Sequence, residues 1–404
     1  MSDNSFASVF GLPTFLNMSK IKTYEEINQK LKSGKAVILT AEEVSKMALQ
    51  ASPEEIVEKV DVVTTATFGA MCSSGAIINF GHANPPIRME KIRLNGVSCY
   101  EGLAAVDSYI GATACDPDNP KYGGAHVIQD LLEGKDVILE AWAKGTDCYP
   151  RKHIRTKINI NTVNEFTLFN PRNAYQNYNV AVNSTKKMIH TYMGTLLSNL
   201  RNATYSTSGE LSPLLNDPEF KTIGLGTRIF LGGTQGFVVW PGTQFHTTKP
   251  KNELGVPVTN AATIAVMGNL KEMSSDYIQA AYFEKYGVSM FVGIGIPIPI
   301  LDVEMAKRVS INNSQIETSV LDYGTNGTPK LGQVSYKELQ SGFIKVNGKK
   351  IRTAPVSSLS KARKIANELK EWLQSGNFEI SKPVQMFPQN TSLKSLNETE
   401  VDND

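Results

Sequence analysis

Cysteine is scarce in this sequence, with four residues among 404, and no two of them form a C-x-x-C pair. The spacings along Cys72, Cys99, Cys115 and Cys148 are 27, 16 and 33 residues. Structural zinc sites and iron–sulfur clusters take closely spaced cysteines, so this pattern argues against either within the chain. Four cysteines in so long a chain also do not make a disulfide framework, and we expect free thiols.

Long apolar runs and an excess of one charge are also missing. No run reaches the roughly 20 residues that a helix needs to cross a bilayer, and two glycines and two prolines interrupt the stretch 288–303. The N-terminus lacks the pattern of a signal peptide. The 41 basic and 39 acidic residues leave no basic field for a phosphate backbone. We therefore expect a cytoplasmic protein that binds neither membrane nor nucleic acid.

Helix starts and buried strands alternate near the N-terminus. Capping boxes begin at Thr23, Thr40 and Ser52, each with a glutamate three residues later. Strand-like apolar runs at 36–39 and 61–65 follow the first and third predicted helices. This alternation predicts an α/β fold, with a mixed sheet core, helices packed on it and glycine-rich loops after strands.

Further local patterns complete the expected fold. Residues 358–375 predict an amphipathic C-terminal helix, and the Asn-Gly within 342–351 predicts a hairpin. The glycines of 224–236 favour a hairpin over a dinucleotide site, because their spacing does not fit G-x-G-x-x-G. Residues 188–200 predict a helix, and 157–169 predict a strand. We expect an irregular N-terminal arm at 1–21, a catalytic region at 22–380 of one body or two subdomains, and a polar disordered tail at 381–404.

Cys72 is the best-placed thiol in the sequence. It follows a predicted buried strand and precedes Ser73, Ser74 and Gly75. Ligands in open α/β sheets bind beyond the carboxyl ends of strands, where small residues let backbone N–H groups approach them. A helix starting at this point would stabilise the thiolate. The alternative is a small buried hydrophobic residue, as most free cysteines are.

Other candidate residues lie in polar loops. Cys148 follows the predicted strand 137–142 and precedes three basic residues, of which Arg151 is the first. His82 and His126 stand in glycine-rich loops and are candidate general acids or bases. Arg88, Arg151 and Arg172 are candidates for holding a substrate carboxylate; we favour the first two.

Four segments together resemble the homocysteine biosynthesis family of anaerobic archaea and bacteria. The segments are 62–76, 81–89, 122–128 and 145–151. The resemblance extends over roughly residues 22–375. It implies that sulfide-level sulfur is built into L-aspartate semialdehyde to give homocysteine, with an external two-electron reductant. The family's two characteristic cysteines fall on Cys72 and Cys148, and its C-terminal regulatory modules have no counterpart here.

The resemblance also suggests roles for the candidate residues. Cys72 would carry sulfur as a persulfide or attack the aldehyde, with backbone N–H groups of 73–75 stabilising the oxyanion. His82 or His126 would move protons, and Cys148 would resolve the persulfide or relay sulfur, provided the thiols lie within bridging distance. No cofactor motif is recognisable and no metal is expected. An iron–sulfur, ferredoxin-like partner would supply electrons, and an oligomer is compatible with the sequence.

Two other classes of protein remain open. A cysteine-dependent acyl or amide hydrolase would use Cys72, a histidine and an oxyanion hole, and would need no reductant. A non-catalytic persulfide carrier would bind a partner protein but would show no affinity for an aldehyde.

Overall fold

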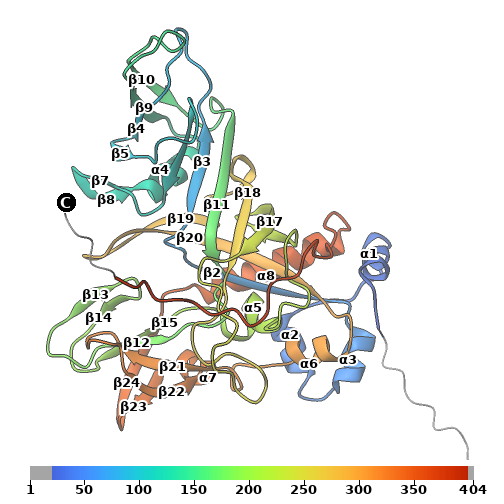
Figure 1. Cartoon of the computed structure of the whole chain (residues 1–404). Coiled ribbons are helices and arrows are strands. Elements are labelled where there is room, and N and C mark those ends of the chain that lie inside the picture. Colours follow the sequence, from blue (N-terminus) through green and yellow to red (C-terminus); the bar gives the residue numbers. More distant parts are fainter. Residues whose placement is uncertain (1–20, 399–404) are drawn as a thin grey trace, which may run out of the picture.

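The computed structural model describes residues 21–398 and is built on a ten-stranded sheet (Figure 1). Its strand order is β1-β2-β20-β16-β17-β18-β11-β3-β6, and β19 pairs with β20. Strands β1 and β2 pair in parallel, whereas the other neighbours are antiparallel. The bounds are β1 Ile38–Thr40, β2 Val62–Ala70, β3 Gly75–Asn79, β6 Asp107–Gly111, β11 Glu165–Asn173, β16 Arg228–Leu231, β17 Thr234–Pro241, β18 Ile264–Asn269, β19 Ile278–Phe283 and β20 Gly287–Pro299.

Smaller sheets extend this core on either side (Figure 1). A four-stranded sheet forms a projecting lobe, with β10 His153–Ile158, β9 Val137–Trp142, β4 Lys91–Leu94 and β5 Val97–Ser98. A six-stranded sheet contains β22 Lys330–Ser335, β21 Glu317–Asp322, β12 Val180–Val182, β15 Asn202–Tyr205, β24 Lys349–Pro355 and β23 Phe343–Val346. Two short pairs are β7 Cys115–Asp116 with β8 Asn119–Gly123, and β13 Ile189–Thr191 with β14 Gly194–Leu196.

Helices pack on this framework, which confirms the mixed α/β class. Their bounds are α1 Tyr24–Lys32, α2 Ala41–Met47, α3 Pro53–Lys59, α4 Gly124–Leu132, α5 Pro213–Asn216, α6 Val303–Val309, α7 Tyr336–Gln340 and α8 Leu359–Gln374. The three predicted capping boxes are present at the starts of α1, α2 and α3. The predicted amphipathic C-terminal helix is α8, which covers β2 and β20. Within residues 21–398, no helix is long and apolar enough to cross a membrane.

Both predicted hairpins are confirmed. Gly232 and Gly233 connect β16 to β17 with φ values of 64° and 95°. Asn347 and Gly348 connect β23 to β24 with φ values of 51° and 76°. Positive φ at both central residues is the geometry of the two-residue turn whose twist matches that of paired strands. Within 224–236, Gly232 and Gly233 therefore reverse the chain between two paired strands.

Three local predictions were wrong. The segment 188–200 contains the β13–β14 hairpin, because Ile189–Thr191 pairs with Gly194–Leu196 across a two-residue turn. The segment 157–169 is interrupted by a turn in which the hydroxyl of Thr162 accepts the N–H of Asn159, so β10 and β11 are separate strands. No helix begins at Cys72, which lies in a turn between β2 and β3.

The expected N-terminal arm at 1–21 lies almost wholly outside the described residues. The segment 381–398, expected to be a disordered tail, instead runs along the body of the protein (Figure 1). Two backbone hydrogen bonds join it to Leu225, and Phe387 is 4% exposed against Phe220 and Phe245. Burial of this aromatic ring offsets the entropy that ordering the segment costs.

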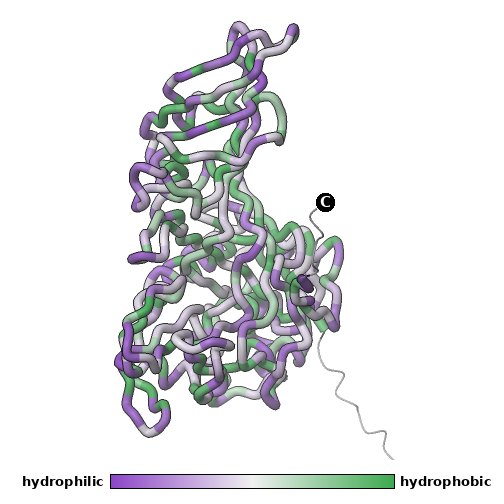
Figure 2. The backbone as a smooth tube through the Cα atoms, turned by 60° about the vertical axis from the view of Figure 1, so that its left-hand side comes forward, coloured by the Kyte–Doolittle hydropathy of each residue, from purple (hydrophilic) through white to green (hydrophobic). Residues whose placement is uncertain are grey.

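The hydrophobic core is continuous through the large sheet and into the lobe. One cluster of buried residues runs from α1 through β2, β3 and β20 to β4 and β9. A second, smaller cluster lies in the six-stranded sheet. The hydropathy tube shows apolar segments inside both parts and hydrophilic segments at the tip of the lobe (Figure 2). The lobe is therefore an extension of the main core.

A buried ion pair joins α1 to the start of β2. Asp61 is 3% exposed and accepts hydrogen bonds from Lys22 Nζ at 2.8 Å and Lys30 Nζ at 2.7 Å. Its other oxygen accepts the backbone N–H of Val37 at 3.0 Å. Burial alone would raise the pKa of this carboxyl, but the two lysines and the N–H group outweigh it and the pKa is lowered.

Replacing Asp61 by asparagine should destabilise the protein by about 3 kcal/mol at neutral pH, because it leaves buried Lys22 without its carboxylate. A carboxyl with a lowered pKa stabilises the fold above its ordinary pKa of 3.8, and that share is lost as the pH falls through the lowered value. In urea unfolding, the difference between wild type and Asp61→Asn should therefore shrink in acid. Asp276→Asn, at an exposed pair with Lys364, should change stability by less than about 0.5 kcal/mol.

Candidate active site

Cys72 stands in a tight turn between two strands of the large sheet. The turn is closed by a hydrogen bond from the Ser74 N–H to the Met71 carbonyl, at 3.0 Å. The Met71 N–H donates to the Met290 carbonyl of β20 at 2.7 Å, which ties the turn to the sheet. Cys72 is half-buried and unpaired. Its thiol is therefore accessible from a backbone that is fixed on both sides.

The end of β11 holds this turn from the neighbouring position in the sheet. Strand β11 pairs with β3 up to Gly75, so its next residues run beside residues 71–74. The side-chain amide of buried Asn170 donates to Ser74 Oγ at 2.7 Å. Ser73 Oγ lies 3.2 Å from both Asn170 Oδ1 and the Arg172 carbonyl oxygen. Ser73 and Ser74 thus anchor the turn to β11.

Gly75 is fixed by packing. A Cβ added there would stand 2.3 Å from the Tyr109 ring and 2.5 Å from the Ile110 carbonyl oxygen of β6. Strand β3 can approach β6 this closely only because residue 75 has no side chain. Because the Ser74 N–H is already used within the turn, it is not free to stabilise an oxyanion in this arrangement.

A small cavity adjoins Cys72. It measures about 40 Å³, which is room for one or two water-sized groups. Four tyrosines and two serines contribute most of its polar atoms, and no acid, lysine, arginine or histidine lines it. The lining residues are Ala70, Cys72, Tyr175, Tyr178, Tyr192, Met193, Ser206, Phe283, Tyr286, Ser289 and Val356.

The tyrosine hydroxyls form a connected chain. Tyr178 donates to Tyr192 at 3.3 Å, and Tyr192 lies 2.9 Å from the hydroxyl of Tyr323. Burial raises the pKa of Tyr175 to about 12 and also raises the pKa values of Tyr178, Tyr286 and Tyr323. These hydroxyls therefore keep their protons at neutral pH and can donate hydrogen bonds to a group bound at Cys72.

Four predicted site residues meet at the tip of the lobe, away from Cys72. The His82 ring stacks on Tyr149 with centroids 6.2 Å apart, and the Arg151 N–H donates to the Pro86 carbonyl at 3.2 Å. Tyr149 and Arg88 line the same open pocket. Cys148 is exposed in the turn before Tyr149, with its sulfur 3.5 Å from Thr146 Oγ1.

Strand β3 separates the chain segments that position the two cysteines highlighted by the sequence. Cys72 precedes this strand, and the loop that contacts the Cys148 turn follows it. Five residues of β-strand span roughly 13 Å, whereas a disulfide needs Cα atoms about 4.4–6.8 Å apart. Cys72 and Cys148 of one chain are therefore not within bridging distance in this arrangement.

His126 has a structural partner. It lies in the first turn of α4, where its Nδ1 accepts the Gly123 N–H at 3.2 Å, and its ring stacks on Tyr122. Burial lowers its pKa, against an opposing effect of Asp130, so the ring is neutral at neutral pH. It does not line the Cys72 cavity. Within residues 21–398, no three His, Cys, Asp or Glu side chains are grouped to hold a metal ion.

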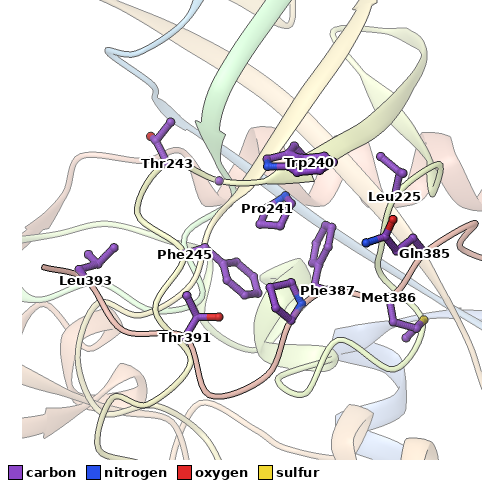
Figure 3. Close-up of a pocket in the computed structure, with 12 residues that line it drawn as sticks. Leu225, Trp240, Pro241, Thr243, Phe245, Gln385, Met386, Phe387, Thr391 and Leu393 are labelled. Atoms are coloured by element: carbon purple, nitrogen blue, oxygen red, sulfur yellow. The ribbon is translucent and has the colours of Figure 1, made fainter.

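A larger cavity of about 590 Å³ lies between β17 and the C-terminal segment (Figure 3). Trp240, Phe245 and Phe387 supply its apolar surface, with Thr243, Thr391 and Gln385 among the polar residues. None of its lining side chains is an acid, a base or a thiol. It therefore lacks groups for covalent or acid–base chemistry.

The tyrosines and Asn170 were missed by the sequence reasoning. The ten residues from Asn170 to Asn179 contain four asparagines, one glutamine and two tyrosines. Four of these amides, at 170, 173, 176 and 177, are at most 1% exposed. A dense run of amides next to aromatic residues was a usable signal, because buried amides must be hydrogen-bonded and so build specific networks.

The fold is that of a mixed α/β protein with a half-buried thiol beside a hydroxyl-lined cavity. Residues 36–380 match the family described as homocysteine biosynthesis enzyme, sulfur-incorporation. The match spans most of the sequence, so the chain belongs to this enzyme family. This confirms the resemblance inferred from the four sequence segments.

Two similar proteins carry the same name, L-aspartate semialdehyde sulfurtransferase. The one from Methanosarcina acetivorans is 49% identical over 94% of this chain and 75% of its own length. The one from Methanocaldococcus jannaschii is 45% identical over 93% of this chain and 75% of its own length. No solved structure gives a significant match.

The separation of the two cysteines predicts the outcome of mild oxidation. Dilute native monomer treated with diamide should yield no peptide pair that links Cys72 to Cys148 within one chain. The same treatment after unfolding in urea should yield the linked pair, because the unfolded chain can bring both thiols together. Mass spectrometry of the monomer fraction makes the measurement. A linked pair from the native monomer would contradict the placement of these thiols.

Proposed function

We propose that this chain is an L-aspartate semialdehyde sulfurtransferase, forming L-homocysteine with Cys72 as its working thiol. The observation that carries the proposal is the identity of 49% and 45%, over more than nine tenths of the chain, to two proteins of that name. The cavity at Cys72 supports it, because a partly exposed thiol among hydroxyl donors suits sulfur addition to a carbonyl.

The chemistry requires one sulfur atom and two electrons. Sulfide adds to the aldehyde R–CHO to give the thiohemiacetal R–CH(OH)–SH, which loses water to give R–CH=S. Two electrons and two protons then give the thiol R–CH₂–SH. Where the sulfur arrives as a Cys72 persulfide, its release as sulfide takes two further electrons and two protons and restores the thiol. Alternatively, the Cys72 thiolate adds to the aldehyde first, and sulfide then displaces it to give the same R–CH(OH)–SH and restore the thiolate.

Protons reach the reacting oxygen most directly from the tyrosines. Tyr178 and Tyr192 line the cavity with Cys72, and both are joined to other hydroxyls. His82 and His126, proposed from the sequence as proton carriers, lie outside the cavity lining. A direct role for either would take a rearrangement of the lobe or a second copy of the chain. The same holds for Cys148 as a resolving thiol and for Arg88 and Arg151 as carboxylate ligands.

Cys72 is the only cysteine in the cavity lining, so no thiol pair there can supply the two electrons and they come from another molecule. We propose a separate iron–sulfur, ferredoxin-like protein as the donor, and the cytoplasm as the place of the reaction, as the family resemblance implies. Sulfide or a sulfide donor would be the second substrate.

The test is homocysteine formation by the purified chain under anaerobic conditions. Aspartate semialdehyde, sulfide and a strong reductant should give homocysteine with the wild type, and Cys72→Ala should reduce it to background because the working thiol is gone. Cys115→Ala removes an exposed thiol outside the cavity and should keep activity within about twofold. Product is measured by derivatisation and mass spectrometry.

Two results would favour the rival classes. Hydrolysis of acyl or amide substrates without a reductant, lost in Cys72→Ala, would point to a hydrolase. Absence of thermal stabilisation by aspartate semialdehyde, with persulfide still forming on Cys72, would point to a carrier. Full activity of Cys72→Ala would sink the proposed mechanism itself.

A further inference from the structure

Arg172 has an unusual environment for a half-buried arginine. Within residues 21–398, its guanidinium makes no hydrogen bond, ion pair or ring contact, and its Nε is buried without a partner. Three other half-buried arginines also have a buried Nε without a partner, but each makes a contact elsewhere: Arg308 pairs with Glu219, Arg228 donates to the Glu379 carbonyl oxygen and Arg93 lies over the Trp142 ring. A buried N–H group without an acceptor is costly, so the Nε of Arg172 points to a ligand that supplies the missing acceptor.

The backbone places Arg172 beside the Cys72 turn. It lies two residues after Asn170 on β11, where an irregularity in the pairing with β18 begins, and irregularities of this kind re-aim side chains. Its N–H donates to Asn170 Oδ1 at 2.9 Å, and its carbonyl oxygen accepts from Ser73 Oγ at 3.2 Å. Arg172 and Cys72 are thus held by the same small network.

Electrostatics connect the guanidinium to the cavity. Burial raises the pKa values of Tyr175 and Tyr286; Arg172 lowers both, whereas the Cys72 thiol raises both. The guanidinium and the sulfur therefore both lie near enough to these two lining tyrosines to act on their hydroxyls.

The cavity contains a second unpartnered polar group. The Ser289 hydroxyl lines it, is 1% exposed and has no hydrogen-bond partner. No carboxylate lines the cavity to neutralise Arg172. The field at Cys72 therefore favours an anionic ligand, with one further hydrogen bond available deep in the site.

We propose that Arg172 binds the carboxylate of a small amino-acid substrate whose carbonyl carbon lies at the sulfur of Cys72. This inference rests on the proposed function and assigns its carboxylate subsite to Arg172, in place of Arg88 and Arg151 on the lobe. Arginine suits the role because its planar fork takes both carboxylate oxygens. A cavity of about 40 Å³ is smaller than the substrate, so Tyr192 and Tyr286, which are 39% and 43% exposed, rotate outward as it enters.

The first test needs no enzymatic activity. Cys72 is alkylated separately with anionic iodoacetate and neutral iodoacetamide, and the rate at Cys72 is followed by peptide mass spectrometry. A cation near the lining tyrosines attracts the anionic reagent, so the ratio of the two rates should fall about tenfold in Arg172→Gln. Arg172→Lys keeps the charge and should keep most of the ratio. Arg155→Gln, at an exposed arginine on β10, should leave it unchanged.

A rate ratio that is the same in wild type and Arg172→Gln would overturn the inference, whether or not homocysteine is formed. Thermal unfolding checks the fold of each variant. Because the guanidinium is unpaired, Arg172→Gln should melt at or above the wild-type temperature. A large loss of stability would instead assign Arg172 a structural role and count against the subsite.

The second test uses the proposed reaction. Arg172→Gln should raise KM for aspartate semialdehyde at least about tenfold with kcat much less affected, and Arg172→Lys should recover only part of the loss, since a lysine cannot bind both oxygens. A KM change with Arg88→Gln but none with Arg172→Gln would overturn the inference. An inactive wild type whose alkylation ratio still depends on Arg172 would keep the anion subsite and reject the proposed function.

Discussion

The antiparallel pairing of β2 with β20 is the contact on which the rest of the structure depends. The two strands pair along nine residues without a shift in register, and eight of the nine residues of β2 are buried. Helix α8 covers this pair, and it approaches closely because Gly293 and Gly295 lack side chains where a Cβ would stand 2.9 and 3.0 Å from Ile365. The end of β2 fixes where the next turn begins. The position of Cys72 is thus set by core packing along the whole length of β2.

Secondary structure could be predicted from the sequence wherever interactions among a few neighbouring residues determine it. The three capping boxes, the two hairpins with glycine at positive φ and the amphipathic α8 all follow from interactions within about four residues. The errors fall where distant partners decide. Residues 188–200 have apolar spacing that suits a helix, but pairing between β13 and β14 determines their structure. The local sequence contains no signal that predicts the position of β3 between β6 and β11 in the sheet.

The candidate site was predictable only in part for the same reason. Cys72, Ser73 and Ser74 were found because they follow a recognisable strand. Their partner Asn170 lies almost one hundred residues away and reaches them through the pairing of β11 with β3. The tyrosines of the cavity lining come from three segments of the chain, at 175–178, 192 and 286, which only the folded sheets bring together. The local sequence around Cys72 was therefore enough to identify the thiol, whereas the residues that surround it are brought there by long-range strand pairing.

The surroundings of Cys72 suit a sulfur atom that changes charge during a reaction. Carboxylates are absent from the cavity lining, so a thiolate or persulfide there meets no like charge from it. The buried tyrosines have raised pKa values and act as neutral donors, which stabilise an anion without fixing it as tightly as a lysine would. Arg172 follows Asn170 in the segment beside the Cys72 turn, and within residues 21–398 its guanidinium has no hydrogen-bond or ion-pair partner. In the proposed site, the tyrosine hydroxyls surround the sulfur and leave it reactive, while the Arg172 guanidinium holds the substrate carboxylate. Substrate binding and sulfur chemistry would then depend on different side chains of one small site.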